Sequence, residues 1–180
     1  MTAPEYIQLK AFARADGFRL ALLWIASFAC YVAGLRLQVM GMAALALALV
    51  TPFYVTRRLK LYRDEGLGGV ISFSRGWGYV AFTFFYACLL FALGQVLYFA
   101  YLDHGYLGST MAQLMATPEA VRALSQTGLT QTWNEALSLL FTMRPIDLAL
   151  NIMTSNLLIG FVVGVPIAAV AKRERIEKVK

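Results

Sequence analysis

This sequence is short of charge and of the residues that most often carry chemistry. Charged residues make up 14% of its 180 residues, whereas soluble domains carry about 25%. It has one histidine, His104, and two cysteines, Cys30 and Cys88. Both cysteines lie inside apolar runs, and neither has a second ligand at a metal-binding spacing. The sequence therefore predicts no metal site, no disulfide and no cofactor.

The apolar runs also lack Asp, Glu, Lys or Arg near their middles. Ion-coupled transporters usually need such a group, so this absence argues against a proton-coupled carrier. The glycine-rich stretch at residues 66–69 is not followed by Lys-Ser or Lys-Thr, so it is not a phosphate loop. No run contains a nucleophile paired with a base. We therefore expect a protein that is not an enzyme and has no catalytic residue.

What the chain does have is apolar residues, at 59% of the total, against about 45–50% in soluble proteins. A chain of this size forms one domain, residues 1–180, and lipid is the natural solvent for so much apolar surface. Residues 1–34 resemble a signal peptide, but no small-residue cleavage site follows, so we expect a retained span. Four transmembrane helices are predicted, at about residues 18–35, 39–56, 76–101 and 147–171.

Lysine and arginine collect in three clusters beside the apolar runs. Basic residues near span ends mark the cytoplasmic side, so the clusters predict that both termini are cytoplasmic. Aromatic residues are not interleaved with them, so we expect anionic lipid headgroups as partners and no nucleic acid. The expected headgroup contacts are Arg57, Arg58, Lys60, Arg63, Lys172 and Arg173. The clusters are Lys10, Arg14 and Arg19; Arg57, Arg58, Lys60, Arg63 and Arg75; and Lys172, Arg173, Arg175, Lys178 and Lys180.

Three local patterns predict how the helices begin, bend and pack. Residues 3–16 have an apolar face and follow a capping box at Thr2, so we expect an amphipathic interfacial helix leading into the first span. Pro52 should bend the second helix or end it early. The spacing Gly160-x-x-x-Gly164 lets two helices touch, either within one chain or across a homodimer.

The least apolar stretch, residues 102–145, lies between the third and fourth spans. Thr117-Pro118-Glu119 and Thr132-Trp133-Asn134-Glu135 are each typical of a helix N-terminus, and Gly128 separates them. The second helix would present an apolar stripe, as a helix lying on a membrane does. The predicted fold class is therefore an all-α membrane protein with four transmembrane helices and an extracytoplasmic hairpin of short interfacial helices.

Two groups of polar residues are candidate sites. Gln95, Asn151, Ser155 and Asn156 lie in the outer halves of spans three and four. They form either hydrogen bonds between helices or a polar cavity for a lipid headgroup or sugar. Asp103, His104 and Trp133 mark the outer interface. Asp103 and His104 are either a proton-handling pair or a polar helix end at headgroup level.

Residues 66–173 carry a recognisable order of features. Gly68-Gly69-Val70-Ile71-Ser72-Phe73 precedes an aromatic-rich span, a polar stretch of short helices follows, and a glycine-containing last span ends in basic residues. This order resembles an uncharacterised family of small bacterial membrane proteins, a domain of unknown function with four spans. The resemblance implies a bacterial inner-membrane location. It carries over no site residue, and it implies an accessory role beside polyprenyl-phosphate glycosyltransferases.

The predicted function is a non-enzymatic accessory or scaffold protein that acts through membrane lipids or a larger membrane protein, such as a glycosyltransferase. The alternative is a small transporter or flippase for a lipid-linked or small polar substrate. A polar, water-accessible cavity would favour the alternative.

Overall fold

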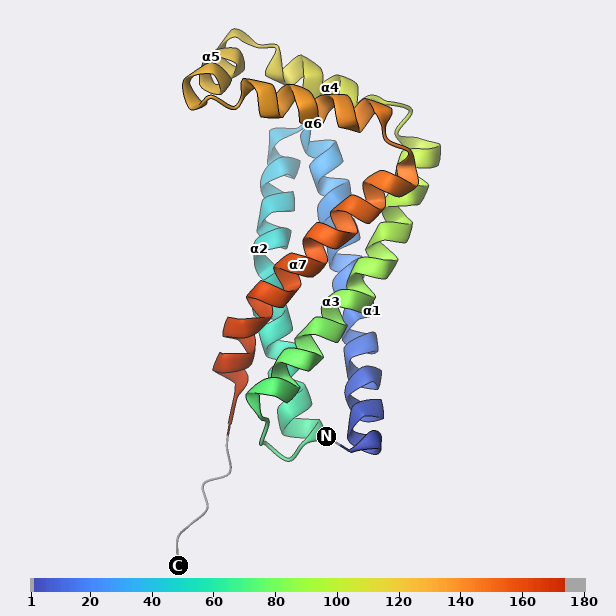
Figure 1. The fold of residues 1–180 in the computed structure, drawn as a ribbon, viewed down its shortest axis with the longest axis vertical. Helices are drawn as coiled ribbons and strands as arrows, with labels where there is room; N and C mark the ends of the chain where they lie inside the picture. The colour runs from blue at the N-terminus through green and yellow to red at the C-terminus, as the bar shows by residue number, and fades with distance from the viewer. Residues whose placement is uncertain (1, 174–180) are drawn as a thin grey trace, which may run out of the picture.

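The computed structural model describes residues 2–173, and that part of the chain is almost entirely helical (Figure 1). Arg175, Lys178 and Lys180 of the third basic cluster lie outside the described residues. Four long helices are α1 (Ala3–Gly34), α2 (Gln38–Leu61), α3 (Phe73–Leu97) and α7 (Pro145–Ala171). Three short helices are α4 (Tyr106–Met115), α5 (Pro118–Thr127) and α6 (Thr130–Thr142). Two π-helical turns, η1 (Tyr62–Gly66) and η2 (Tyr98–Leu102), extend α2 and α3.

The predicted all-α class with four membrane-length helices is confirmed. Among the described residues, four helices are long and apolar enough to cross a membrane: Ala3–Gly34, Gln38–Gly66, Phe73–Leu102 and Pro145–Ala171. Each corresponds to one of the four predicted spans. Apolar side chains cover the outward faces of these helices as well as the faces that pack in the core.

The long helices pack as a bundle in which α1 contacts α2 and α3, while α7 packs mainly along α3. Figure 1 shows α7 running diagonally in front of α1 and α2, alongside α3. Gly160 makes the crossing of α7 over α3 close, since a Cβ atom there would lie 2.4 Å from the ring of Phe84. Gly164, one turn further on, is also buried. The Gly160-x-x-x-Gly164 motif therefore serves packing within the chain in this structure.

The interfacial helix predicted at residues 3–16 is wrong as a separate element. Residues 3–16 are the first half of the continuous helix α1, which has 32 residues and is about 48 Å long. Leu9 and Ala13 are buried in the bundle core. Phe12 packs on Tyr62, with 5.0 Å between ring centroids. The apolar face thus covers the end of α2 instead of facing a membrane. Similarly, Pro52 does not end α2, which continues to Leu61.

The segment between α3 and α7 forms three short helices, so the predicted hairpin of two is not confirmed. The sequence located α5 correctly: the Thr117 hydroxyl accepts a hydrogen bond from Ala120 N–H, and Gly128 ends the helix at φ 69°. Helix α6 begins at Thr130, before the cap predicted at Thr132. Helix α4 was not predicted. We call α4, α5 and α6 the cap layer, because they lie across one end of the bundle (Figure 1).

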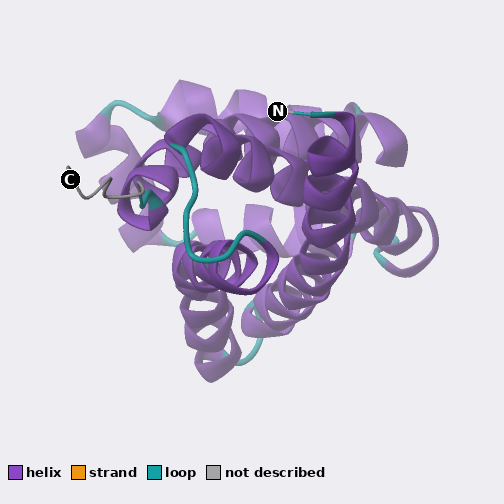
Figure 2. Cartoon of the chain, turned by 90° about the horizontal axis from the view of Figure 1, so that it is seen from below, coloured by secondary structure: helices purple, strands orange, loops and turns teal. Residues whose placement is uncertain are grey.

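The opposite end holds the start of α1, the loop from α2 to α3 and the end of α7, and we call it the basic end. Figure 2 views the molecule from this end, with that loop in front. Ile71 N–H donates to the Arg173 carbonyl at 3.0 Å, and Arg173 N–H donates to the Ile71 carbonyl at 3.1 Å. The Gln8 side chain donates to the Gly66 carbonyl at 3.1 Å. These contacts bring the described members of the three basic clusters to one end.

Candidate functional site

The basic end is organised around Asp16, which is 1% exposed. Its carboxylate accepts hydrogen bonds from Arg58 at 2.6 Å, from Arg19 at 3.0 Å and from the Tyr79 hydroxyl. Burying a carboxylate is costly unless it is paired and hydrogen-bonded, and here three donors from three helices satisfy it. We call these four residues the Asp16 cluster. It ties α1, α2 and α3 together.

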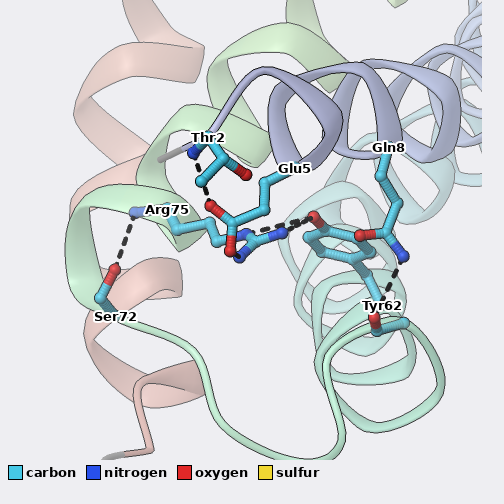
Figure 3. Close-up of polar contacts among 7 residues, drawn as sticks. Thr2, Glu5, Gln8, Tyr62, Ser72 and Arg75 are labelled. Carbon is cyan, nitrogen blue, oxygen red and sulfur yellow. Dashed lines mark hydrogen bonds and ion pairs between the residues drawn. The ribbon is translucent and has the colours of Figure 1, made fainter.

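A second set of polar contacts continues from the Asp16 cluster to the start of α1. Tyr62 stacks on Tyr79 with 5.0 Å between ring centroids and 10° between planes. Arg75 lies between Tyr62 and Glu5 (Figure 3), and its guanidinium donates to the Tyr62 hydroxyl at 3.3 Å and to the Glu5 carboxylate at 3.1 Å. The same carboxylate accepts the Thr2 N–H at 2.7 Å. Glu5 thus caps α1 and also joins it to α3.

The six predicted headgroup residues divide into two groups. Arg58 belongs to the Asp16 cluster, and Arg63 donates to the Ala171 carbonyl at 3.0 Å and to Asp64 at 2.7 Å. The carbonyls at the end of a helix favour a cation, so Arg63 secures the end of α7. The other four are exposed on the surface of the basic end: Arg57, Lys60, Lys172 and Arg173.

The structure does not bring the four predicted cavity residues together. Asn151 and Ser155 are exposed on α7, and the Ser155 hydroxyl donates to the Asn151 carbonyl at 3.1 Å. Asn156 faces a hollow between α1, α2 and α7. Gln95 lines a different hollow, between α1 and α3. Asn151 and Ser155 share one face of α7, and that face is exposed.

The hollow beside Gln95 is a groove of about 620 Å³, which we call the α1–α3 groove. Gln95 is 2% exposed, and its Oε1 atom has no hydrogen-bond partner among the described residues. An unsatisfied buried acceptor costs about 1–3 kcal/mol. Apolar and aromatic side chains make up most of the wall. The lining residues are Ile25, Phe28, Ala29, Val32, Ala33, Arg36, Phe91, Gly94, Gln95, Tyr98, Leu102 and Tyr106.

The mouth of the groove near the cap layer is basic. Arg36 is exposed, and its guanidinium lies 4.9 Å from the ring centroid of Tyr106 in a cation–π contact. Arg36 is one of only three basic residues outside the clusters. Within the groove, Tyr98 belongs to η2 and packs edge-on against Phe28 at 5.1 Å. π-helical turns are rare and frequently lie at functional sites.

A second hollow, of about 500 Å³, lies between α1, α2 and α7. Phe28 and Phe91 line both hollows, and their ring centroids are 6.0 Å apart. The polar groups of α1 on this side are paired: Trp24 donates to the Thr51 hydroxyl at 3.0 Å, and Ser27 donates to the Ala44 carbonyl at 2.9 Å. The two hollows are thus separated by an aromatic wall.

The residues of the predicted outer interface have separate structural roles. Asp103 is 8% exposed, and its carboxylate accepts the Leu107 N–H at 3.0 Å in the first turn of α4. His104 is exposed at φ 45°, with Nδ1 3.2 Å from the Leu102 carbonyl. Trp133 is half-buried on α6. Asp103 therefore positions the start of α4. Among residues 2–173, no three His, Cys, Asp or Glu side chains gather as a metal site would require.

Sequence reasoning missed both the Asp16 cluster and the groove. Asp16 had a signal, because it is the one acid within the first basic cluster and lies three residues before Arg19. The groove had little signal. It depends on how far α1 and α3 separate, and no residue pattern reports that distance.

These features define a helical membrane protein: four membrane-length helices, an aromatic groove with a basic mouth, and a paired charge cluster at the opposite end. The chain belongs to a family described as a protein of unknown function (DUF4199), whose model matches residues 16–173. The predicted resemblance to a family of unknown function is therefore confirmed. No curated protein and no solved structure matches this chain.

Proposed function

We propose that this chain is an accessory or scaffold protein of the bacterial inner membrane, with both termini in the cytoplasm and no catalytic activity of its own. Its partners are membrane lipids and a larger membrane protein, for which a polyprenyl-phosphate glycosyltransferase is the first candidate. The observation that carries this proposal is the cap layer. Within the described part of the chain, helices α5 and α6 contain no buried residue.

The cap layer exposes apolar side chains that the bundle does not cover. Val121, Leu129, Leu139 and Phe141 are each at least half exposed. These residues lie outside the membrane-length helices, so contact of those helices with lipid does not explain why the four side chains are exposed. Exposed apolar surface of this kind marks a contact with another protein or with a membrane surface.

The distribution of charge supports the orientation. The described members of the basic clusters gather at the basic end, and positively charged ends favour the cytoplasm. Near the cap layer, Arg144 is paired with Asp147 at 2.6 Å, and Arg36 lies against Tyr106. Cysteine labelling from outside the cell tests this orientation. Ser109→Cys should react and Lys60→Cys should not, in a chain whose two native cysteines are replaced by alanine.

Site-specific photo-crosslinking in native membranes tests the accessory role. A crosslinking residue at Leu139 should capture one larger membrane protein in stoichiometric yield, and mass spectrometry would identify it. The control position is Leu49 on α2, which is exposed but lies in a membrane-length helix, so it should capture lipid. Equal protein capture at both positions, or lipid alone at Leu139, contradicts the accessory role.

One observation favours the alternative of a small carrier or flippase, namely that two hollows adjoin at Phe28 and Phe91. Movement of those rings would join the hollows into one passage. Reconstituted vesicles carrying fluorescent lipids would detect such transport as accelerated exchange between leaflets. Phe91→Ala should increase the rate if the rings form a barrier, and an unchanged low rate in both proteins removes this alternative.

A further inference from the structure

We infer that the α1–α3 groove binds a single-chain anionic lipid whose chain carries a hydroxyl group about 15 Å from its acidic end. In this arrangement Arg36 holds the acidic group and Gln95 accepts the hydroxyl. A fatty acid hydroxylated in mid-chain has this chemistry. The inference rests on the proposed membrane placement but not on the accessory role.

The first step is the requirement at Gln95. Its Oε1 atom is buried without a donor from the described residues, and the side chain lines the groove. A carbonyl oxygen accepts hydrogen bonds and cannot donate them. The matching ligand group is therefore a hydroxyl or N–H. An ordinary saturated chain has neither, so Gln95 Oε1 would stay unsatisfied and would still reduce the stability of the protein.

The second step is the charge at the mouth. Arg36 borders the groove and is exposed, and its contact with Tyr106 occupies the face of the guanidinium. The N–H groups at its edge remain suited to a carboxylate or phosphate, which a guanidinium can bind through two parallel hydrogen bonds. An anionic end is thus favoured at the mouth, and a neutral or cationic one is not.

The third step is the separation of these two groups. Gly94 lies level with Ile25, because a Cβ atom added to Gly94 would lie 3.5 Å from that side chain. Arg36 follows Ile25 by eleven residues, and α1 covers the first nine of them, to Gly34. At 1.5 Å per residue these nine rise about 13.5 Å, so Arg36 lies about 15 Å from the level of Ile25. An extended chain advances about 1.2 Å per bond, as the polypeptide backbone does. About a dozen bonds then connect the acidic group to the hydroxyl.

The fourth step is the wall between them. Apart from Gln95 and the tyrosine hydroxyls, the lining between the two levels is apolar, including Phe28, Ala29, Val32 and Ala33. Such a surface suits methylene groups. A sugar or a glycerol headgroup would leave its hydroxyls without partners along most of this length. The geometry therefore favours a chain with one internal hydroxyl over a headgroup drawn into the groove.

Native mass spectrometry of the full-length protein in detergent tests this inference with three probes: 12-hydroxystearate, stearate and the methyl ester of 12-hydroxystearate. The first should bind about tenfold more tightly than either of the others, the equivalent of one buried hydrogen bond or one charge contact. Gln95→Leu should abolish the preference for the hydroxyl and leave the preference for the free acid. Arg36→Gln should do the reverse.

Matched controls are Gln113→Leu on α4 and Arg122→Gln on α5, both exposed and outside the groove, and both should keep the two preferences. The inference is overturned if stearate binds as tightly as 12-hydroxystearate to the unmodified protein, or if Gln95→Leu retains the hydroxyl preference. Circular dichroism of each variant identifies any that fails to fold. The accessory role fails separately, since crosslinking at Leu139 does not depend on this ligand.

Discussion

At one end of this bundle a buried polar group is hydrogen-bonded, and towards the other end a buried polar atom lacks a partner among the described residues. At the basic end, Asp16 is buried with three hydrogen-bond donors, and two of them, Arg58 and Tyr79, come from other helices. Towards the cap layer, Gln95 is buried equally deeply but Oε1 has no partner among the described residues. A satisfied buried network holds helices together, whereas an unsatisfied group costs stability and is kept where function requires it. The comparison separates the part of the molecule that maintains the fold from the part that is suited to bind.

The largest effect should come from Asp16→Ala. Removing the carboxylate leaves Arg58 partly buried without its partner, and breaking a buried pair typically costs about 3–5 kcal/mol. Thermal unfolding in detergent, followed by circular dichroism, would measure the loss. Asp64→Asn is the control, because Asp64 is exposed and its pair with Arg63 lies at the surface. A loss no greater than that of the control would show that the basic end is not the stabilising one.

A smaller loss is expected from Gly160→Ala in the crossing of α7 over α3. The new methyl group would overlap the Phe84 ring, and overpacking of this kind costs about 1–3 kcal/mol. Gly78→Ala on α3 is the matched control, since no atom lies within 4 Å of an added Cβ there. It should be neutral or slightly stabilising, through helix propensity alone. If both variants behave alike, the crossing is looser than the structure indicates.

Gln95→Leu should change stability in the opposite direction. It replaces an unsatisfied buried group with an apolar one of similar size, so the free energy of unfolding should rise by about 1 kcal/mol. This gain sharpens the comparison, because the same kind of replacement at Asp16 should be strongly destabilising. Thermal unfolding of Gln95→Leu beside Gln113→Leu would measure it. A decrease in stability would mean that Gln95 has a partner in the membrane-embedded protein.

The smallest effect is expected from Arg144→Gln near the cap layer. Its pair with Asp147 is short, at 2.6 Å, but both side chains are exposed, and exposed ion pairs contribute little. The unfolding midpoint should not change measurably. A clear decrease would show that charge pairs stabilise both ends and would weaken the contrast between them.

The sequence was sufficient for the elements whose signal is local. Long apolar runs gave the four membrane-length helices, and Thr117 with Gly128 gave both ends of α5. The sequence was not sufficient where contacts between distant segments determine the structure. The amphipathic pattern of residues 3–16 fits a membrane surface as well as it fits a protein core. Only the contact of Phe12 with Tyr62 shows that this face packs on protein. Helix α4 was missed because its start depends on Asp103 accepting a hydrogen bond from Leu107 N–H, and no sequence pattern predicts this contact.

The candidate site was predictable only in part. Gln95 was identified from its polarity within an apolar run, but its grouping with Asn151, Ser155 and Asn156 assumed that the polar faces of α3 and α7 meet. Gln95 instead lines the groove between α1 and α3, whereas Asn151 and Ser155 are exposed. Arg36 differs from most basic residues of the sequence only in lying outside the three clusters, and its role depends on the position of Tyr106, nine residues beyond the end of α3.

The pairing of Ile71 with Arg173 also has a consequence for where the four long helices are fixed to one another. It joins the loop before α3 to the end of α7, and with the Asp16 cluster it links all four long helices at the basic end. If the helices rotate about that end, their displacement grows with distance from it. The α1–α3 groove would then open most near the cap layer and least beside the Asp16 cluster. Spin labels at Met42 and Leu150 would record this motion as a broad distance distribution, beside a narrow one for a pair at the basic end.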